Sequence, residues 1–374
     1  MSHVKRLTER GDWVFLSIAV TLLILGLVIL SSASSALAFS IFNDSFHFLK
    51  QQSIWAVLGI AVMFFFMIFD YQKLRPFAFP LLLISYALLI ALFIPGVGAV
   101  RNNVRSWIDI GSFSFQPVEL VKLFLIIFLS TRFSEVALKS VKTIAGGVKP
   151  FLYTTVPILF LIFIQPDFGS MVVVFSIAFF IFFISGANAL HIAYIVAASF
   201  LSIPLLIIFE PYKFERLTSF LNPTGDLAGS GYHLHQALIA IGSGGWFGKG
   251  YGKSVQKLQY LPEVAGDSIF AVVGEEMGFF GSIFIVILFF VLIFRGLKIA
   301  SNSSDLFGKL LAVGIISWIA IQTFLNIGAI TGLLPITGLP LPFISQGGTS
   351  LITLLAGIGI IFNISRQTPR PFIH

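Results

Sequence analysis

Long apolar segments separated by short polar ones run through almost the whole chain. Apolar runs lie near residues 13–36, 53–69, 77–95, 117–132, 151–165, 168–185, 189–209, 268–294, 309–330 and 349–364. A bilayer crossing takes roughly 20 apolar residues, so each run is close to the length of a transmembrane helix. The pattern predicts an all-α polytopic protein with about ten transmembrane helices, in one membrane domain that spans residues 1–374.

The composition supports the membrane prediction and excludes several classes of function. Hydrophobic residues make up 57% of the 374 positions and charged residues only 10%, whereas a soluble domain carries about 25% charged residues. So few charges do not fit a nucleic-acid-binding protein. The chain has no Cys, which excludes disulfides and thiolate metal sites. It also lacks a phosphate-binding loop and a dinucleotide fingerprint, so no nucleotide is expected.

The distribution of basic residues predicts the orientation. If the N-terminus is placed inside, the short outer loops hold only Lys50, Arg101 and Arg105. The inner segments then hold most of the 23 Lys and Arg: Lys5, Arg6, Arg10, Lys73, Arg75, Arg132, Lys139, Lys142, Lys149, Arg295, Lys298, Lys309, Arg366 and Arg370. By the positive-inside rule both termini are cytoplasmic.

Three segments on the predicted outer side are unusual. Residues 96–116 are polar, and residues 210–266 form a large loop between the seventh and eighth helices that is rich in Gly, aromatic and basic residues. Residues 331–348 are apolar but interrupted by Pro and Gly. We expect this last segment to fold back against the bundle, since irregular backbone at membrane depth is tolerated only against protein. Any chemistry is expected on the outer face.

Two ionisable residues fall within the fourth apolar segment. Glu119 and Lys122 share a helical face at spacing i, i+3 and can pair. Each charge alone would cost roughly 2.5–3.5 kcal/mol near the centre of a membrane helix. Two interpretations stay open: a structural ion pair, or a pair whose lysine also faces a cavity with Arg105 and binds an anionic ligand.

Two aspartates open apolar segments, and either can cap a helix. Asp167 follows Pro166 and precedes Phe168-Gly169-Ser170, and capping is the favoured interpretation there. Asp267 ends a loop that holds Lys249, Lys253, Lys257 and several aromatic residues. That setting suits an anionic, sugar-bearing substrate.

Two further pairs are interpreted structurally. Glu275 and Glu276 are adjacent on a helix and point about 100° apart, so they are expected to bond neighbouring elements and not to form a catalytic dyad. His233 and His235 lie in an amphipathic stretch, residues 231–241, expected along the outer interface. Without Cys or an ordered third ligand, a metal site at this pair is the minor interpretation.

A series of short motifs, taken in their order along the chain, carries a resemblance to a known family. The chain resembles the SEDS peptidoglycan polymerases, the RodA and FtsW family, from about residue 13 to residue 365. The motifs are Arg105-Ser106-Trp107-Ile108, Gln116-Pro117-Val118-Glu119-Leu120-Val121-Lys122, Gln165-Pro166-Asp167-Phe168-Gly169-Ser170, Gly231-Tyr232-His233, Ala240-Ile241-Gly242-Ser243-Gly244-Gly245-Trp246-Phe247-Gly248-Lys249-Gly250, Leu261-Pro262-Glu263, Asp267, and Gly338-Leu339-Pro340-Leu341-Pro342-Phe343-Ile344-Ser345-Gln346-Gly347-Gly348.

The resemblance implies a function and a site. The implied activity is peptidoglycan glycosyl transfer, which polymerises lipid II at the outer face of the bacterial plasma (inner) membrane. Asp267 matches the family's essential aspartate, while Arg105, Glu119 and Lys122 match its polar cluster. Gln116, Lys249 and Ser345 lie in the same motifs and are expected to bind substrate. Asp267 is either the base that activates the acceptor hydroxyl or the ligand of a divalent cation, Mg²⁺ or Mn²⁺.

The resemblance also implies partners, and the sequence departs from the family in places. The expected partners are a class B penicillin-binding protein, which is a transpeptidase, and other proteins of the division or elongation machinery. The segments 31–35, 48–52 and 274–278 are closer to FtsW. The family often has His-Thr before the aspartate and Phe after it, but Ala265, Gly266 and Ser268 stand here. Val118 replaces a usual Ser and Gln346 a common Tyr.

Two other classes of function compete with the enzyme. A lipid II flippase would also need charges in a membrane cavity, but along the whole crossing, whereas the ionisable residues here concentrate toward the outer half. A non-catalytic scaffold for cell division would leave Asp267 as a helix cap only.

Overall fold

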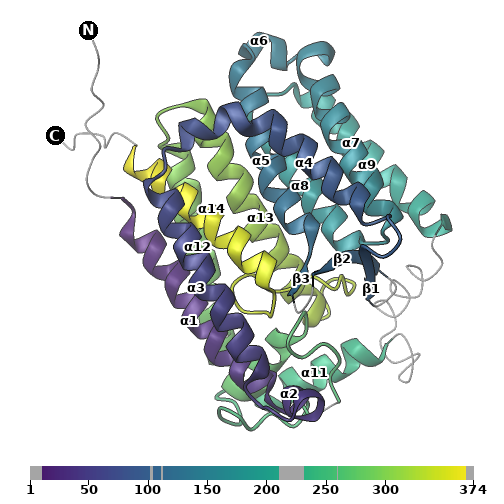
Figure 1. The fold of residues 1–374 in the computed structure, drawn as a ribbon, viewed down its shortest axis with the longest axis vertical. Coiled ribbons are helices and arrows are strands. Elements are labelled where there is room, and N and C mark those ends of the chain that lie inside the picture. Colours follow the sequence, from purple (N-terminus) through teal and green to yellow (C-terminus); the bar gives the residue numbers. More distant parts are fainter. Residues whose placement is uncertain (1–10, 102–103, 111–112, 210–230, 259, 368–374) are drawn as a thin grey trace.

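The protein is a bundle of helices with one small sheet. The structure is a computed structural model that describes residues 11–101, 104–110, 113–209, 231–258 and 260–367. Figure 1 shows the arrangement of its elements. The α-helices are α1 (Trp13–Ala33), α2 (Ser35–Phe42), α3 (His47–Ile68), α4 (Ala78–Ala91), α5 (Pro117–Glu135), α6 (Leu138–Val141), α7 (Lys149–Ile164), α8 (Phe168–Ile184), α9 (Ala189–Phe209), α11 (Tyr232–Gly244), α12 (Ile269–Ser301), α13 (Leu306–Ile330) and α14 (Gly348–Arg366).

The remaining elements are short. They are the 3₁₀-helix η1 (Tyr71–Phe77), the π-helix η2 (Ile144–Val148) and the strands β1 (Gly98–Arg101), β2 (Val104–Ile110) and β3 (Phe113–Phe115).

The predicted polytopic helical architecture is confirmed. Every apolar segment expected to cross the membrane contains a helix, including α7 and α8 on either side of the break at residues 165–167. Among the described residues, 7 helices are long and apolar enough to span a bilayer, and Phe168–Ile184 of α8 and Ala189–Leu201 of α9 are shorter apolar stretches. The number of crossings and the cytoplasmic position of the termini stay predictions.

Helix α13 lies at the centre of the bundle and packs against α5, α8, α12 and α14 (Figure 1). In the most apolar 18-residue stretch of α13, 72% of the residues are buried. In the corresponding stretch of α12 only 22% are buried, and Phe and Ile side chains of this helix point outward. Helix α13 is thus enclosed by other helices, whereas much of α12 faces outward. Polar side chains on α13 are therefore buried and need partners.

The segment 96–116 forms a feature that the all-α prediction did not include. Strands β1, β2 and β3 make an antiparallel sheet in that order, with Ile108 opposite Phe115. In β2 the apolar Val104, Ile108 and Ile110 recur at every second or fourth position, as expected for a half-buried strand. Figure 1 shows the sheet and α11 at one end of the bundle and α6 at the opposite end.

The apolar, irregular segment after α13 folds into the bundle as predicted. Leu341 and Ile344 in this segment, the 331–347 loop, are buried. The loop passes so close to α1 that a Cβ added at Gly26 would lie 2.2 Å from the Phe343 carbonyl oxygen. It connects α13 to α14 at the end of the bundle where the sheet lies, so it can line an outer-face site.

Candidate active site

A buried ion pair joins two residues of α5. Pro117 is the first residue of this helix, where its missing N–H costs no hydrogen bond. Lys122 Nζ donates to Glu119 Oε1 at 2.8 Å, and the two side chains are 0% and 2% exposed. Lys122 also donates to Gln322 Oε1 at 2.9 Å and lies 5.0 Å from the centre of the Trp318 ring. The predicted ion pair is therefore confirmed, and its ammonium is shared with a second helix.

Three side chains on one face of α13, which we call the α13 polar row, continue from this pair. They are Trp318, Gln322 and Asn326, at spacing i, i+4 and i+8, so the row runs about 12 Å along the helix. Trp318 Nε1 donates to Gln322 Oε1 at 2.8 Å, and Gln322 Nε2 donates to the Pro340 carbonyl at 2.9 Å. The row thus links the ion pair to the 331–347 loop.

The last member of the row holds Asp267. Asn326 Nδ2 donates to the Asp267 carbonyl at 2.8 Å and to the Leu339 carbonyl at 2.7 Å. From the 331–347 loop, Ser345 Oγ donates to the Gly266 carbonyl at 2.6 Å. The backbone before α12 is thereby fixed from two sides. Its main-chain position does not depend on the Asp267 carboxylate.

The side chain of Asp267 is 11% exposed and does not act as the helix cap. Ser268 occupies the N-cap of α12, and its side chain caps no backbone N–H. The polar groups near the carboxylate include the Ser268 hydroxyl, whose Oγ lies 3.4 Å from Asp267 Oδ1, and the His233 ring. The carboxylate is accordingly not accounted for by helix capping.

Helix α11 brings a histidine to Asp267. Leu234, Ala237 and Ala240 of α11 are buried, and the helix packs against α12. His233 Nε2 lies 4.0 Å from Asp267 Oδ1 and forms a hydrogen bond with Ser268 Oγ. Helix α11 therefore places an imidazole beside this aspartate.

Asp167 caps α8, as predicted. Its Oδ1 accepts from the Ser170 backbone N–H at 3.0 Å and its Oδ2 from the Ser170 hydroxyl at 2.7 Å. The carboxylate is also close enough to Lys122 and Glu119 to interact electrostatically with both. The turn at residues 165–167 thus lies beside the ion pair.

The predicted substrate-binding residues of the sheet and of α5 differ in accessibility. Arg105 lies on β2 and is exposed, and its backbone N–H donates to the Gln165 carbonyl at 3.3 Å. Among the described residues it forms no ion pair. Gln116 precedes α5, is half-buried, and donates its backbone N–H to Thr349 Oγ1 at 3.4 Å. Arg105 is therefore available to a ligand, whereas Lys122 is already paired.

Two glutamates of α12 fix the loop that follows α11. Glu275 accepts from Lys249 Nζ at 2.7 Å and from the Ser254 hydroxyl. Glu276 accepts from Lys257 Nζ at 2.8 Å and from the Ser32 hydroxyl of α1 at 2.7 Å. The two carboxylates have separate cationic partners, which confirms that they are not a dyad. Lys249 lies in this structural network, and a substrate role for it stays a prediction.

The described residues contain no group of three or more His, Asp or Glu side chains arranged to hold a metal ion. Within the described part of the chain, the Asp267 carboxylate has the His233 imidazole 4.0 Å away. Mg²⁺ commonly takes one or two carboxylates and fills its other positions with water and substrate phosphate. The donor set therefore fits a cation that depends on substrate for its remaining ligands.

Sequence reasoning missed the α13 polar row and the role of His233. The sequence contains a pattern that could have predicted the row, because Gln322 and Asn326 are one helical turn apart within an otherwise apolar segment. No sequence pattern predicts that His233 approaches Asp267, since this contact depends on how α11 packs on α12.

Comparison with known proteins identifies similar sequences. The profile of the family described as cell cycle proteins, which covers FtsW, RodA and SpoVE, matches residues 12–370. Stage V sporulation protein E of Bacillus subtilis is 43% identical over 357 residues, which cover 96% of this chain and 97% of that protein. The probable peptidoglycan glycosyltransferase FtsW of Geobacter metallireducens is 39% identical over 359 residues, covering 96% of each chain.

Solved structures agree with the sequence matches. A chain of a peptidoglycan synthase complex that coordinates polymerization and crosslinking superposes with a TM-score of 0.81 at 28% identity, covering 96% of this chain and 98% of that one. The rod shape determining protein RodA of Thermus thermophilus gives a TM-score of 0.70 at 26% identity, covering 97% of this chain and 99% of that one.

The ion pair generates a stability prediction. Lys122→Met keeps the volume of the side chain but leaves the Glu119 charge buried, which should cost about 3–5 kcal/mol. We expect a lower melting temperature in detergent and less folded protein. Replacing both partners, in Lys122→Met/Glu119→Gln, should recover part of the loss. Lys253→Met, at an exposed lysine, is the control and should melt like wild type. A wild-type melting temperature for Lys122→Met would contradict the assignment.

Proposed function

This chain belongs to the FtsW, RodA and SpoVE family of multi-pass membrane proteins, and from that premise we propose that it is a peptidoglycan glycosyltransferase whose reacting carboxylate is Asp267. The observation that supports the site is the fixed position of Asp267. Its main chain is held by Asn326 and its neighbour Gly266 by Ser345, while its side chain caps no helix. A carboxylate held in place without a capping role suits proton transfer at a defined point.

The reaction we propose joins two lipid-linked sugars, with lipid II as substrate. A hydroxyl of the acceptor sugar attacks the anomeric carbon of the donor, forming the new C–O bond. The hydroxyl proton passes to Asp267, and the bond to pyrophosphate breaks, releasing polyprenyl pyrophosphate. The protein must therefore provide one base near the acceptor and positive charge near the departing pyrophosphate.

Among the described cations, Arg105 is one that is available to the pyrophosphate. It is exposed on β2, at the same end of the bundle as α11 (Figure 1). Lys122, Lys249 and Lys257 are each bonded to a buried glutamate. A guanidinium can bind two phosphate oxygens at once, which favours Arg over Lys at such a site. The paired lysines instead shape the site by fixing α5 and the loop before α12.

His233 is proposed as the positioning residue for Asp267. It contacts Ser268, and its Nε2 lies 4.0 Å from Asp267 Oδ1. Because its ring is held by the Ser268 hydroxyl, His233 can restrict the rotamers of the neighbouring carboxylate. A divalent cation, Mg²⁺ or Mn²⁺, held by Asp267 would lower the pKa of the acceptor hydroxyl and screen pyrophosphate.

The proposed partner is a penicillin-binding protein with transpeptidase activity. A structurally similar chain belongs to a synthase complex that coordinates polymerization and crosslinking, and crosslinking is a separate reaction from glycosyl transfer. The relatives named FtsW and stage V sporulation protein E are 39% and 43% identical to this chain. They favour a role in division or in sporulation over one in elongation.

Asp267→Asn tests the proposed function. Asn keeps the size and polarity of the side chain but cannot accept a proton, so we expect polymerisation of lipid II by purified protein to fall at least about a hundredfold. The melting temperature should stay near wild type. Asp44→Asn, the same change at an external carboxylate paired with Lys50, is the control. Near wild-type glycan synthesis by folded Asp267→Asn would remove this residue from the mechanism.

His233→Gln tests the positioning role. Gln can still bond to Ser268 but lacks the imidazole, so we expect kcat to fall about tenfold with a smaller change in KM for lipid II. His235→Gln changes a histidine two residues further along α11 and should leave both constants unchanged. Equal rates for the two variants would show that His233 has no role beyond α11 folding.

A further inference from the structure

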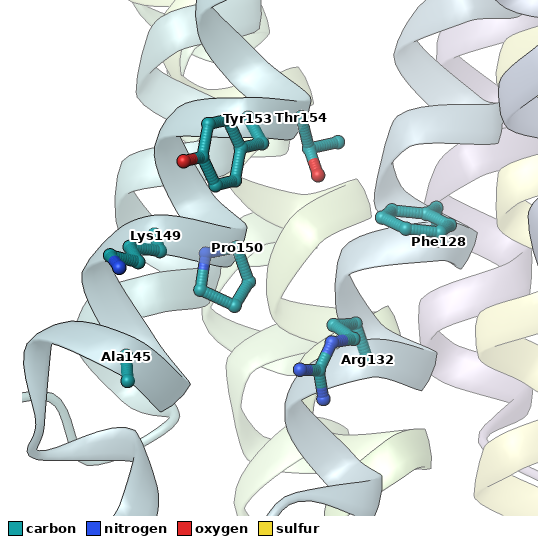
Figure 2. A pocket seen from close by; sticks show the side chains of 7 residues that line it. All are labelled: Phe128, Arg132, Ala145, Lys149, Pro150, Tyr153 and Thr154. Atoms are coloured by element: carbon teal, nitrogen blue, oxygen red, sulfur yellow. The ribbon is translucent and has the colours of Figure 1, made fainter.

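A groove at the end of the bundle opposite the candidate active site has features of a ligand site. It encloses about 290 Å³ and is lined by Phe128, Arg132, Ala145, Lys149, Pro150, Tyr153 and Thr154. Figure 2 shows Phe128 and Arg132 on one helix facing Pro150 and Thr154 on the other, with Lys149 at the outer rim. The helices are α5 and α7, and η2 closes the end of the groove.

The groove is separate from the active site. Arg132 follows Lys122 by ten residues on α5, which is about 15 Å along the axis. Helices α5 and α14 begin side by side, where the Gln116 N–H donates to Thr349 Oγ1, and both run toward the end opposite the sheet. By the positive-inside rule, the basic residues gathered at that end predict that it is the cytoplasmic end. The groove therefore opens at the inner leaflet.

The charges at the groove are uncompensated within the described part of the chain. Neither Arg132 nor Lys149 forms an ion pair there, and Glu135, one turn beyond Arg132, is exposed and does not pair with them. Lys139 and Lys142 are exposed on the short connection between the two helices. The mouth of the groove is accordingly positive, whereas Phe128, Pro150 and Ala145 make its wall apolar.

An apolar surface leads away from this positive mouth. Tyr153, Val156 and Phe160 are exposed along α7 at spacing i, i+3 and i+7, so they form one stripe toward the other end of the helix. A ligand with an anionic head and an acyl chain would match both parts. Basic pockets between transmembrane helices on the cytoplasmic side bind the headgroups of anionic lipids.

We propose that this groove binds an anionic phospholipid of the inner leaflet. Arg132 and Lys149 bind the phosphate, and an acyl chain lies along Tyr153, Val156 and Phe160. The lipid bridges α5 and α7 where η2 separates them. Because α5 carries the Glu119–Lys122 pair, an inner-leaflet lipid would support the helix on which the outer site is built.

Lipid titration of the purified full-length protein tests the proposal. Delipidated protein in a neutral detergent is titrated with phosphatidylglycerol, phosphatidylcholine or inorganic phosphate, and bound ligand is measured by native mass spectrometry. We expect binding of phosphatidylglycerol at least about tenfold tighter than that of phosphatidylcholine. Inorganic phosphate should not bind measurably. Equal binding of the two lipids, or binding of phosphate alone, would overturn the proposal.

Variants locate the site. Each cation contributes about fivefold, so Arg132→Gln/Lys149→Gln should weaken phosphatidylglycerol binding about twenty-fivefold. Lys139→Gln/Lys142→Gln removes the same charge outside the groove and should change binding less than about twofold. Ala145→Trp fills the groove without changing charge and should also abolish tight binding. If the two double variants weaken binding equally, the lipid is attracted by surface charge in general and the groove is not a specific site. If a groove variant loses a co-purifying protein but binds lipid as wild type does, the groove is the site of a protein partner instead.

Discussion

The need to satisfy every polar group inside a bilayer is the constraint on which this structure depends. The clearest case is Lys122, whose ammonium is completely buried and bonded to Glu119 and Gln322. Neither helix can move away without leaving a charge or an amide unpaired in a medium without water. The ion pair therefore fixes α5 to α13, and the rest of the outer-face architecture is built on that contact.

The same constraint explains how an irregular segment can be held at membrane depth. The carbonyls of Pro340 and Leu339 in the 331–347 loop accept from Gln322 and Asn326. Asn326 also bonds to the Asp267 carbonyl, so one face of α13 places the loop and the turn at Asp267 together. On the other side, Glu275 and Glu276 fix the loop that follows α11. Polar residues that look dispersed in the sequence thus converge on the backbone around Asp267.

The sequence allowed the helical architecture and most of the pairwise chemistry to be predicted, because both follow from local spacing. Apolar run lengths locate the spans, and the i, i+3 spacing predicts the Glu119–Lys122 pair. What could not be predicted depends on packing between distant segments. The sheet depends on the pairing of three short strands, and His233 reaches Asp267 only because α11 packs on α12. For the same reason Lys249 is a plausible ligand residue in the sequence but a partner of Glu275 in the structure.

The most direct test of this account is the rate of lipid II polymerisation by Asn326→Leu, compared with Thr323→Val on the same helix. Both positions are buried, but the Thr323 hydroxyl has no hydrogen-bond partner in the described structure, whereas Asn326 holds the Asp267 turn. The account predicts that Asn326→Leu lowers kcat at least about tenfold and that Thr323→Val leaves it near wild type. Equal, near wild-type rates for the two variants would show that the α13 polar row does not position Asp267 for the proposed reaction.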